Sequence, residues 1–184
     1  KHDSMTHAEI NFLFDKKELN GIYKEGNKCF VGASTTVTDL IESEIIQNHF
    51  SRFSKYAKLV SSTPIRNMAT MAGNFVNASP IGDFTIFFLA LDAQLILSDE
   101  KSKREIALKD FYKGYKTIDK KPEEHIEQFY FELPDTNTKF NFEKVSKRTH
   151  LDIASVNTAI KLKMDGEKII AASISAGGVF AYPK

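Results

Sequence analysis

A stretch of small and polar residues near the middle of the chain could bind an anion through its backbone. The sequence MATMAGNFVNASP, residues 68–80, places Gly73 between alanine and asparagine, with hydroxyl side chains close by. Glycine lets a ligand approach the main chain closely, and successive N–H groups in such a bend can face negatively charged oxygens. Neither GxGxxG nor GxxxxGK[ST] occurs in the sequence, so it predicts neither a Rossmann nor a P-loop nucleotide site.

The polar side chains of this stretch suit a polyol or a sugar phosphate better than an apolar ligand. Asn74 and Asn77 can donate and accept hydrogen bonds, and Thr70 and Ser79 add hydroxyl groups. Asp83 would repel a diphosphate, so we expect it to accept from ribose or ribityl hydroxyls, or else to stabilise the first turn of a helix. The same small residues could instead simply let two helices pack closely, and composition alone favours that alternative.

Apolar periodicity predicts the helices that would hold this stretch. Residues 45–60 carry apolar side chains every three or four positions, which is typical of an amphipathic helix. A second helix is expected after the stretch, with Ser79 as its N-cap and Pro80 at its first position. Earlier in the chain, INFLF and KCFVGA are predicted strands, and Ser34 or Thr35 is expected to cap the next helix.

Alternating patterns predict antiparallel strands in the second half of the chain. AQLIL and REIAL flank the charged segment SDEKSK, which is typical of a hairpin. QFYFEL places Phe129 and Phe131 on one side of a strand, and residues 156–164 alternate apolar and polar side chains. Asp165 and Gly166 then predict a tight turn into KIIAASISAGG. We therefore expect an antiparallel sheet at the C-terminal end.

The composition excludes several classes of protein. Lys plus Arg number 25 against 24 Asp plus Glu, so no overall charge points to nucleic acid or a membrane surface. The apolar run FTIFFLALDAQLIL contains Asp92 and is shorter than the ~20 residues that a membrane span requires. Cys29 is the single cysteine, which excludes an internal disulfide or a cysteine-bound metal cluster and favours the cytoplasm.

The central stretch and its flanks resemble one known family. IRNMATMAGNFVNASPIGDFTIFFLALDAQLIL resembles the second FAD-binding segment in the flavin subunits of molybdenum hydroxylases, the family of xanthine dehydrogenase and the carbon monoxide dehydrogenase medium chain. FVGASTTVTDL, PEEHIEQFYFELP, FEKVSKRTHLDIASVNTAIKL and SAGGVFAYPK resemble further elements of the same family. Together these segments cover the chain from about residue 30 to its end. The resemblance implies FAD as the cofactor.

The resemblance also implies a fold and a domain organisation. The expected fold class is α+β: an antiparallel sheet flanked by helices, as in the second lobe of a PCMH-type FAD-binding domain, followed by a smaller C-terminal α+β flavoprotein lobe. Residues 1–29 would be a remnant of the N-terminal FAD lobe, 30–136 the central FAD-binding lobe and 137–184 the start of the C-terminal lobe. The family's Gly-rich first segment does not precede INFLFDKKEL, so we expect a fragment of a longer subunit or a shortened relative.

Position by position, the resemblance implies contacts with FAD. Ala72 stands where the family often has glycine, and its methyl group narrows the approach of a phosphate. His125 and Ile126 match positions at the nucleotide end of FAD, and Lys144 matches a lysine near the cofactor. His125 could equally be an ordinary surface or core residue, and Lys144 part of a solvated strand face. The implied FAD contacts are Thr70, Ala72, Gly73, Asn74, Val76, Asn77, Asp83, His125, Ile126 and Lys144.

The function that the resemblance implies is electron transfer. An FAD-binding subunit of a molybdenum-hydroxylase-type oxidoreductase relays electrons from iron–sulfur clusters on a partner to an external acceptor. The expected partners are a molybdopterin-binding large subunit and a [2Fe-2S] small subunit. No catalytic acid or base and no metal ligand is expected in this chain. The alternative is a cofactor-free assembly module that keeps the fold and has lost FAD.

Overall fold

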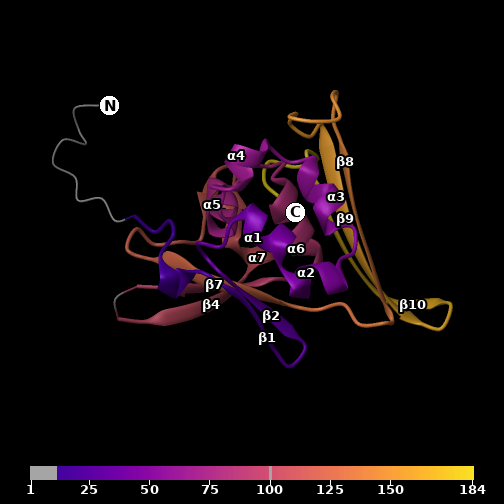
Figure 1. Ribbon diagram of the computed structural model, residues 1–184, viewed down its shortest axis with the longest axis horizontal. Helices are drawn as coiled ribbons and strands as arrows, with labels where there is room; N and C mark the ends of the chain where they lie inside the picture. The colour runs from indigo at the N-terminus through magenta and orange to yellow at the C-terminus, as the bar shows by residue number, and fades with distance from the viewer. Residues whose placement is uncertain (1–11, 100) are drawn as a thin grey trace.

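The protein is built from antiparallel sheets and short helices (Figure 1), and the structure, a computed structural model, describes residues 12–99 and 101–184. A five-stranded sheet has the order β1-β2-β7-β3-β4, and a three-stranded sheet has the order β10-β9-β8. The strands are β1 (Ile22–Glu25), β2 (Lys28–Gly32), β3 (Gln94–Ser98), β4 (Lys103–Ala107), β5 (Tyr112–Gly114), β6 (Thr117–Ile118), β7 (His125–Glu132), β8 (Thr138–Val145), β9 (Val156–Asp165) and β10 (Lys168–Gly177).

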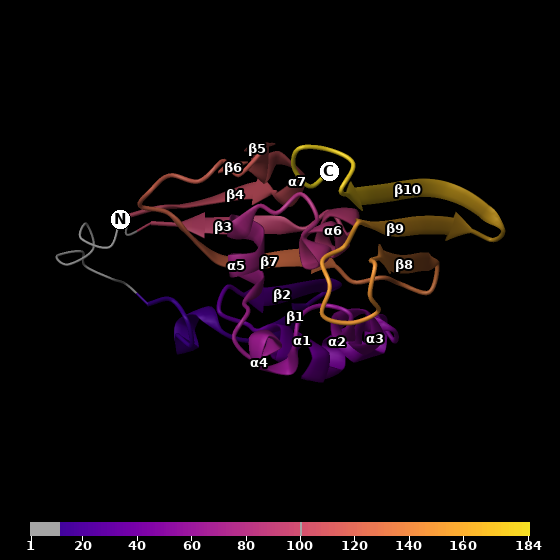
Figure 2. The ribbon, with the colours of Figure 1, turned by 90° about the horizontal axis from the view of Figure 1, so that it is seen from above.

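The helices are short, and most of the α-helices gather in the angle between the five-stranded and three-stranded sheets (Figures 1 and 2). They are η2 (Lys17–Leu19, a 3-10 helix), α1 (Val37–Glu42), α2 (Glu44–His49), α3 (Phe53–Lys58), α4 (Thr63–Arg66), α5 (Met71–Asn77), α6 (Asp83–Ala90) and α7 (Leu108–Phe111). Among the helices described, none is long and apolar enough to cross a membrane.

Helix α6 joins the two larger sheets into one hydrophobic core. Every residue of α6 is buried, because the helix has a sheet on either side. Phe88 packs against Phe129 of β7 with ring centroids 4.9 Å apart, and Phe87 packs against Phe140 of β8 at 4.7 Å. Aromatic side chains bury large apolar areas, so these pairs contribute much of the stability of the core. Helix α5, which carries Gly73, comes directly before this fully buried helix in the chain.

The strands that alternation predicted are present. β3 and β4 form the hairpin around SDEKSK, and β9 and β10 form the C-terminal hairpin. Gly166 in its turn has φ 57°, a conformation that glycine adopts without strain. Phe129 and Phe131 are both buried, as their spacing in β7 requires. KCFVGA contains β2, whereas the predicted strand INFLF begins outside the described residues, and residues 12–14 are not a strand.

The predicted helix boundaries need correction. The single helix expected over residues 45–60 is interrupted after His49, giving α2 and α3. The cap of α1 is Thr36 rather than Ser34 or Thr35, because only Thr36 forms a capping box with Asp39. Both are boundary errors, and the apolar face that the periodicity predicted does pack into the core.

The central stretch is more structured than the loop that the sequence predicted. It contains α5, which follows α4 closely, and α5 ends where Ala78 adopts a left-handed φ of 48°. Ser79 and Pro80 do not start the next helix: a turn closed by a 3.0 Å bond from the Gly82 N–H to the Ser79 carbonyl precedes α6. Gly82 is the N-cap of α6, and Asp83 is its first residue.

Candidate functional site

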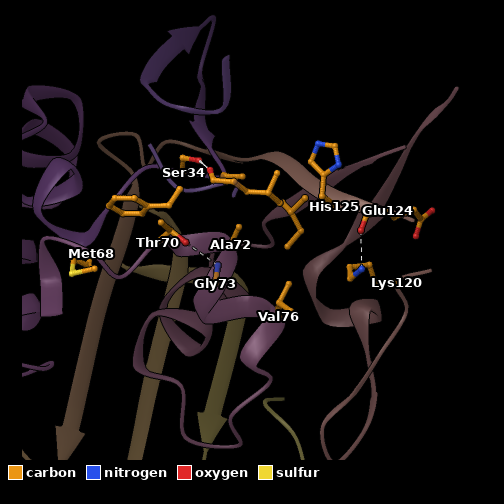
Figure 3. Close-up of a pocket in the computed structure, with 13 residues that line it drawn as sticks. Ser34, Met68, Thr70, Ala72, Gly73, Val76, Lys120, Glu124 and His125 are labelled. Atoms are coloured by element: carbon orange, nitrogen blue, oxygen red, sulfur yellow. Dashed lines mark hydrogen bonds between the residues drawn. The ribbon is translucent and has the colours of Figure 1, made fainter. Parts of the chain in front are cut away.

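A cavity of about 350 Å³ lies at the start of α5 (Figure 3). Helix α5 and the segment just before it line one side, the start of β7 and the segment leading into it line another, and the chain before η2 completes the rim. The lining is mostly apolar, with a few polar and charged groups, as in many ligand pockets. The lining residues are Leu13, Phe14, Ala33, Ser34, Met68, Thr70, Ala72, Gly73, Val76, Lys120, Glu124, His125 and Ile126.

The first turn of α5 lies at this cavity and includes a backbone amide for which the described residues offer no acceptor. The N-cap Thr70 accepts the Gly73 N–H at 3.1 Å through its Oγ1. The Met71 N–H donates to the Thr35 carbonyl at 3.2 Å. Within the described part of the chain, the Ala72 N–H has no acceptor. Because the first amides of a helix lack partners within it, a ligand oxygen could accept from Ala72. The Gly73 N–H already donates to Thr70, so it stabilises the start of the helix and is not a free donor for a ligand.

The opposite side of the cavity is fixed by an ion-pair network. Arg104 on β4 donates through Nε to Glu124 Oε1 at 2.6 Å and through Nη2 to Glu124 Oε2 at 2.9 Å. The same Nη2 reaches Asp119 Oδ1 at 3.0 Å. Hydrogen bonds from Arg104 to the buried carboxylate lower the pKa of Glu124 to about 2, so it stays ionised. This network holds residues 119–124 against β4 and thereby helps to position the adjoining His125.

Lys120 is a site residue that sequence reasoning missed. Its Nζ donates to the carbonyls of Lys121 at 2.8 Å and Glu124 at 2.7 Å, so the ammonium group is held at the cavity wall. Figure 3 shows Lys120, Glu124 and His125 across the cavity from Thr70 and Gly73. In the sequence Lys120 belongs to a charged turn, and neither periodicity nor the resemblance marks it.

The structure brings most of the predicted FAD contacts into this cavity. The predicted residues that line it are Thr70, Ala72, Gly73, Val76, His125 and Ile126. Asn74 does not line it: its Oδ1 accepts from the N–H of Thr85 at 3.2 Å and from the Thr85 hydroxyl at 2.9 Å. Asn77 Oδ1 accepts from Lys116 Nζ at 3.1 Å. Both amides therefore have roles within the protein, and their contact with FAD stays a prediction.

Asp83 and Lys144 lie together in a different place. Lys144 Nζ is 2.8 Å from Asp83 Oδ2, and their side chains are only 3% and 9% exposed respectively. Asn157 on β9 donates to the other oxygen of Asp83 at 2.6 Å, and Lys144 also reaches the Leu59 carbonyl at 2.9 Å. This buried cluster ties the first turn of α6 to the three-stranded sheet, and neither Asp83 nor Lys144 lines the cavity. That either residue contacts FAD stays a prediction.

The described residues offer neither a metal-binding cluster nor a reactive thiol. Across residues 12–99 and 101–184, no cluster of three or more His, Cys, Asp or Glu could hold a metal ion. Cys29 is fully buried in β2, and this burial raises the pKa of its thiol to about 12. A thiol that stays protonated is a weak nucleophile and a poor metal ligand.

Comparison with known proteins points to one family. The family described as FAD binding domain in molybdopterin dehydrogenase matches residues 4–134. The nicotinate dehydrogenase FAD-subunit of Eubacterium barkeri is 30% identical over 171 residues, covering 91% of this chain and 58% of the relative. The carbon monoxide dehydrogenase medium chain of Afipia carboxidovorans is 30% identical over 171 residues, covering 93% of this chain and 59% of the relative.

A solved structure supports the same relationship. Cyanide-inactivated Cu,Mo-CO dehydrogenase superimposes with a TM-score of 0.85 at 29% identity, covering 92% of this chain and 59% of the matched chain. The fold class expected from the resemblance is confirmed, with antiparallel sheets and flanking helices in both. The chain thus spans under two thirds of the length of these relatives. The alternative of a module that has lost FAD finds no support, because the relatives are FAD subunits or medium chains. The chain belongs to the family of FAD binding domains in molybdopterin dehydrogenase, and its cofactor is FAD.

Proposed function

We propose that this protein is the FAD-binding electron-transfer subunit of a molybdenum-hydroxylase-type oxidoreductase, and that the cavity at α5 receives part of the FAD. The observation that carries the proposal is the free Ala72 amide in a cavity whose opposite wall carries a lysine ammonium group. A backbone donor and a fixed positive charge together suit a diphosphate.

The chemistry of the lining fits a dinucleotide. Ile126, Val76 and Met68 offer apolar surface for a flat ring, while Thr70 and the Ala72 amide offer polar contacts. A cavity of about 350 Å³ encloses only part of so large a ligand. The rest of the cofactor therefore requires surface beyond this cavity. We also propose that residues 1–29 belong to the N-terminal FAD lobe, residues 30–136 to the central FAD-binding lobe, and residues from 137 onward to the C-terminal lobe.

The residues of this chain bind and orient the cofactor and perform no acid–base step. Bound FAD supplies the chemistry that joins single-electron carriers to a two-electron acceptor. Asn74, Asn77, Asp83 and Lys144 complete the proposed contact set together with the cavity residues. The partners we propose are a molybdopterin-binding large subunit and a [2Fe-2S] small subunit, since the relatives include medium chains of CO and glyceraldehyde dehydrogenases. The electron acceptor is an external oxidant.

The proposal is tested by the visible spectrum of the purified full-length protein. Protein expressed in the presence of flavin should show the absorbance bands of an oxidised flavin and release FAD, rather than FMN, on denaturation. The folded state of each preparation is checked by circular dichroism. Folded, colourless protein that takes up no FAD in a titration would overturn the proposal.

A further inference from the structure

Among the described residues that line the cavity, Lys120 is a cation without a counter-charge within ion-pair distance. Arg104 pairs with Glu124 and Asp119, and Lys113 pairs with Asp119 at 3.3 Å. These two cations and two carboxylates balance one another. Among the described residues, no carboxylate lies within ion-pair distance of Lys120. The cavity wall thus has a net positive charge that is located at Lys120.

Two of the three N–H groups of the Lys120 ammonium group donate to backbone carbonyls, which leaves the third for a ligand. An ammonium group has three donors, and here the Lys121 and Glu124 carbonyls accept at 2.8 Å and 2.7 Å. Lysine side chains at a surface usually lose rotamer freedom when they bind a ligand. Since Lys120 is half-buried and already bonded to two carbonyls, most of that entropy cost is met in the folded protein.

We propose that Lys120 is a binding residue that recognises a phosphate group of the cofactor and makes the cavity selective for FAD over riboflavin. The inference rests on the proposed function, because it assumes that the cavity holds the cofactor. The Ala72 amide on one side and Lys120 on the other would contact the same diphosphate. Arg104 and Glu124 act as positioning residues, because they fix the turn from which Lys120 reaches the cavity.

The test measures the affinities of FAD, ADP and riboflavin for the full-length wild-type protein and for Lys120→Met. FAD and ADP carry the diphosphate and riboflavin does not. We expect Lys120→Met to weaken FAD and ADP about ten-fold and riboflavin less than two-fold, as for loss of one charge-assisted hydrogen bond. Added salt should weaken FAD binding more in the wild type than in the variant, because salt screens the lost charge interaction.

Matched variants separate charge from structure. Lys121→Met removes a neighbouring exposed lysine that does not line the cavity, and it should bind all three ligands as the wild type does. Lys120→Arg keeps the charge and should retain most of the FAD and ADP affinity. Equal loss of riboflavin and FAD in Lys120→Met would show that the turn had collapsed and would overturn the inference.

The outcomes for the inference and for the proposed function are distinct. Wild-type affinities for FAD and ADP that survive in Lys120→Met overturn the inference and leave the proposed function intact. A wild-type protein that binds ADP but neither flavin overturns the proposed function, while loss of ADP binding in Lys120→Met would still support the phosphate contact. A wild-type protein that binds none of the three overturns both.

Discussion

Asn74 illustrates how a side chain near a binding loop can serve the scaffold. Its Oδ1 accepts from the backbone and hydroxyl of Thr85, so it links α5 to α6 one residue after Gly73. Asn74→Asp keeps this acceptor and adds a negative charge close to the proposed diphosphate. We expect FAD affinity to fall about ten-fold, with little change in melting temperature. Flavin titration and thermal unfolding measure the two effects.

The control for Asn74 removes the acceptor instead of adding charge. Asn74→Ala leaves the Thr85 N–H and hydroxyl without this partner and should cost about 1 kcal/mol of unfolding free energy. Unchanged FAD affinity in Asn74→Asp would place the negatively charged part of FAD away from the start of α5. The loop motif in the sequence was enough to point to Thr70, Ala72, Gly73 and Val76, which line the cavity. The Asn74–Thr85 bond could not, because it depends on how two helices pack.

The contact between α6 and the three-stranded sheet depends on a buried ion pair. Lys144→Met should leave the Asp83 carboxylate buried without its cation and should cost about 3 kcal/mol of unfolding free energy. Lys161→Met on the neighbouring strand is the matched control, because its pair with Asp92 is more exposed and should cost less than about 1 kcal/mol. Urea unfolding measures both values. Equal costs for the two variants would contradict this account of Lys144.

Strands with alternating apolar and polar residues, bounded by turn residues, were predictable from the sequence. The hairpins β3–β4 and β9–β10 follow from period-two alternation and turn residues, which are local signals. Helix starts were not: Ser79 and Pro80 satisfy the capping rules, yet the chain forms a turn there and α6 begins at Asp83. The carboxylate of Asp83 bonds Lys144 and Asn157, more than 60 residues away in sequence. Such long-range contacts carry no local signature.

At the scale of the whole molecule, acid should destabilise the fold through paired carboxylates. The pKa of Glu124 falls from its usual value near 4.5 to about 2 because Arg104 donates hydrogen bonds to it. Hydrogen bonds from lysine, arginine or backbone N–H groups also lower the pKa of Asp99, Asp119, Asp135 and Asp152. Between the two values for Glu124, the unfolded chain binds a proton that the folded chain does not. Unfolding free energy should therefore fall as pH decreases below about 4.5.

The contribution of Glu124 can be isolated with neighbouring variants. Glu124→Gln should be about 2 kcal/mol less stable than the wild type near pH 7, because Arg104 loses its bidentate charged partner. That difference should narrow as pH falls from about 4.5 toward 2, because protonation of Glu124 in the unfolded wild-type chain lowers the free energy of the unfolded state, which Glu124→Gln cannot do. Glu123→Gln, at an exposed position, should follow the wild-type curve throughout. Urea unfolding midpoints from neutral to acidic pH measure the three curves.

A difference between Glu124→Gln and wild type that stays constant over this range would show that the Arg104–Glu124 pair does not set the acid sensitivity of the fold.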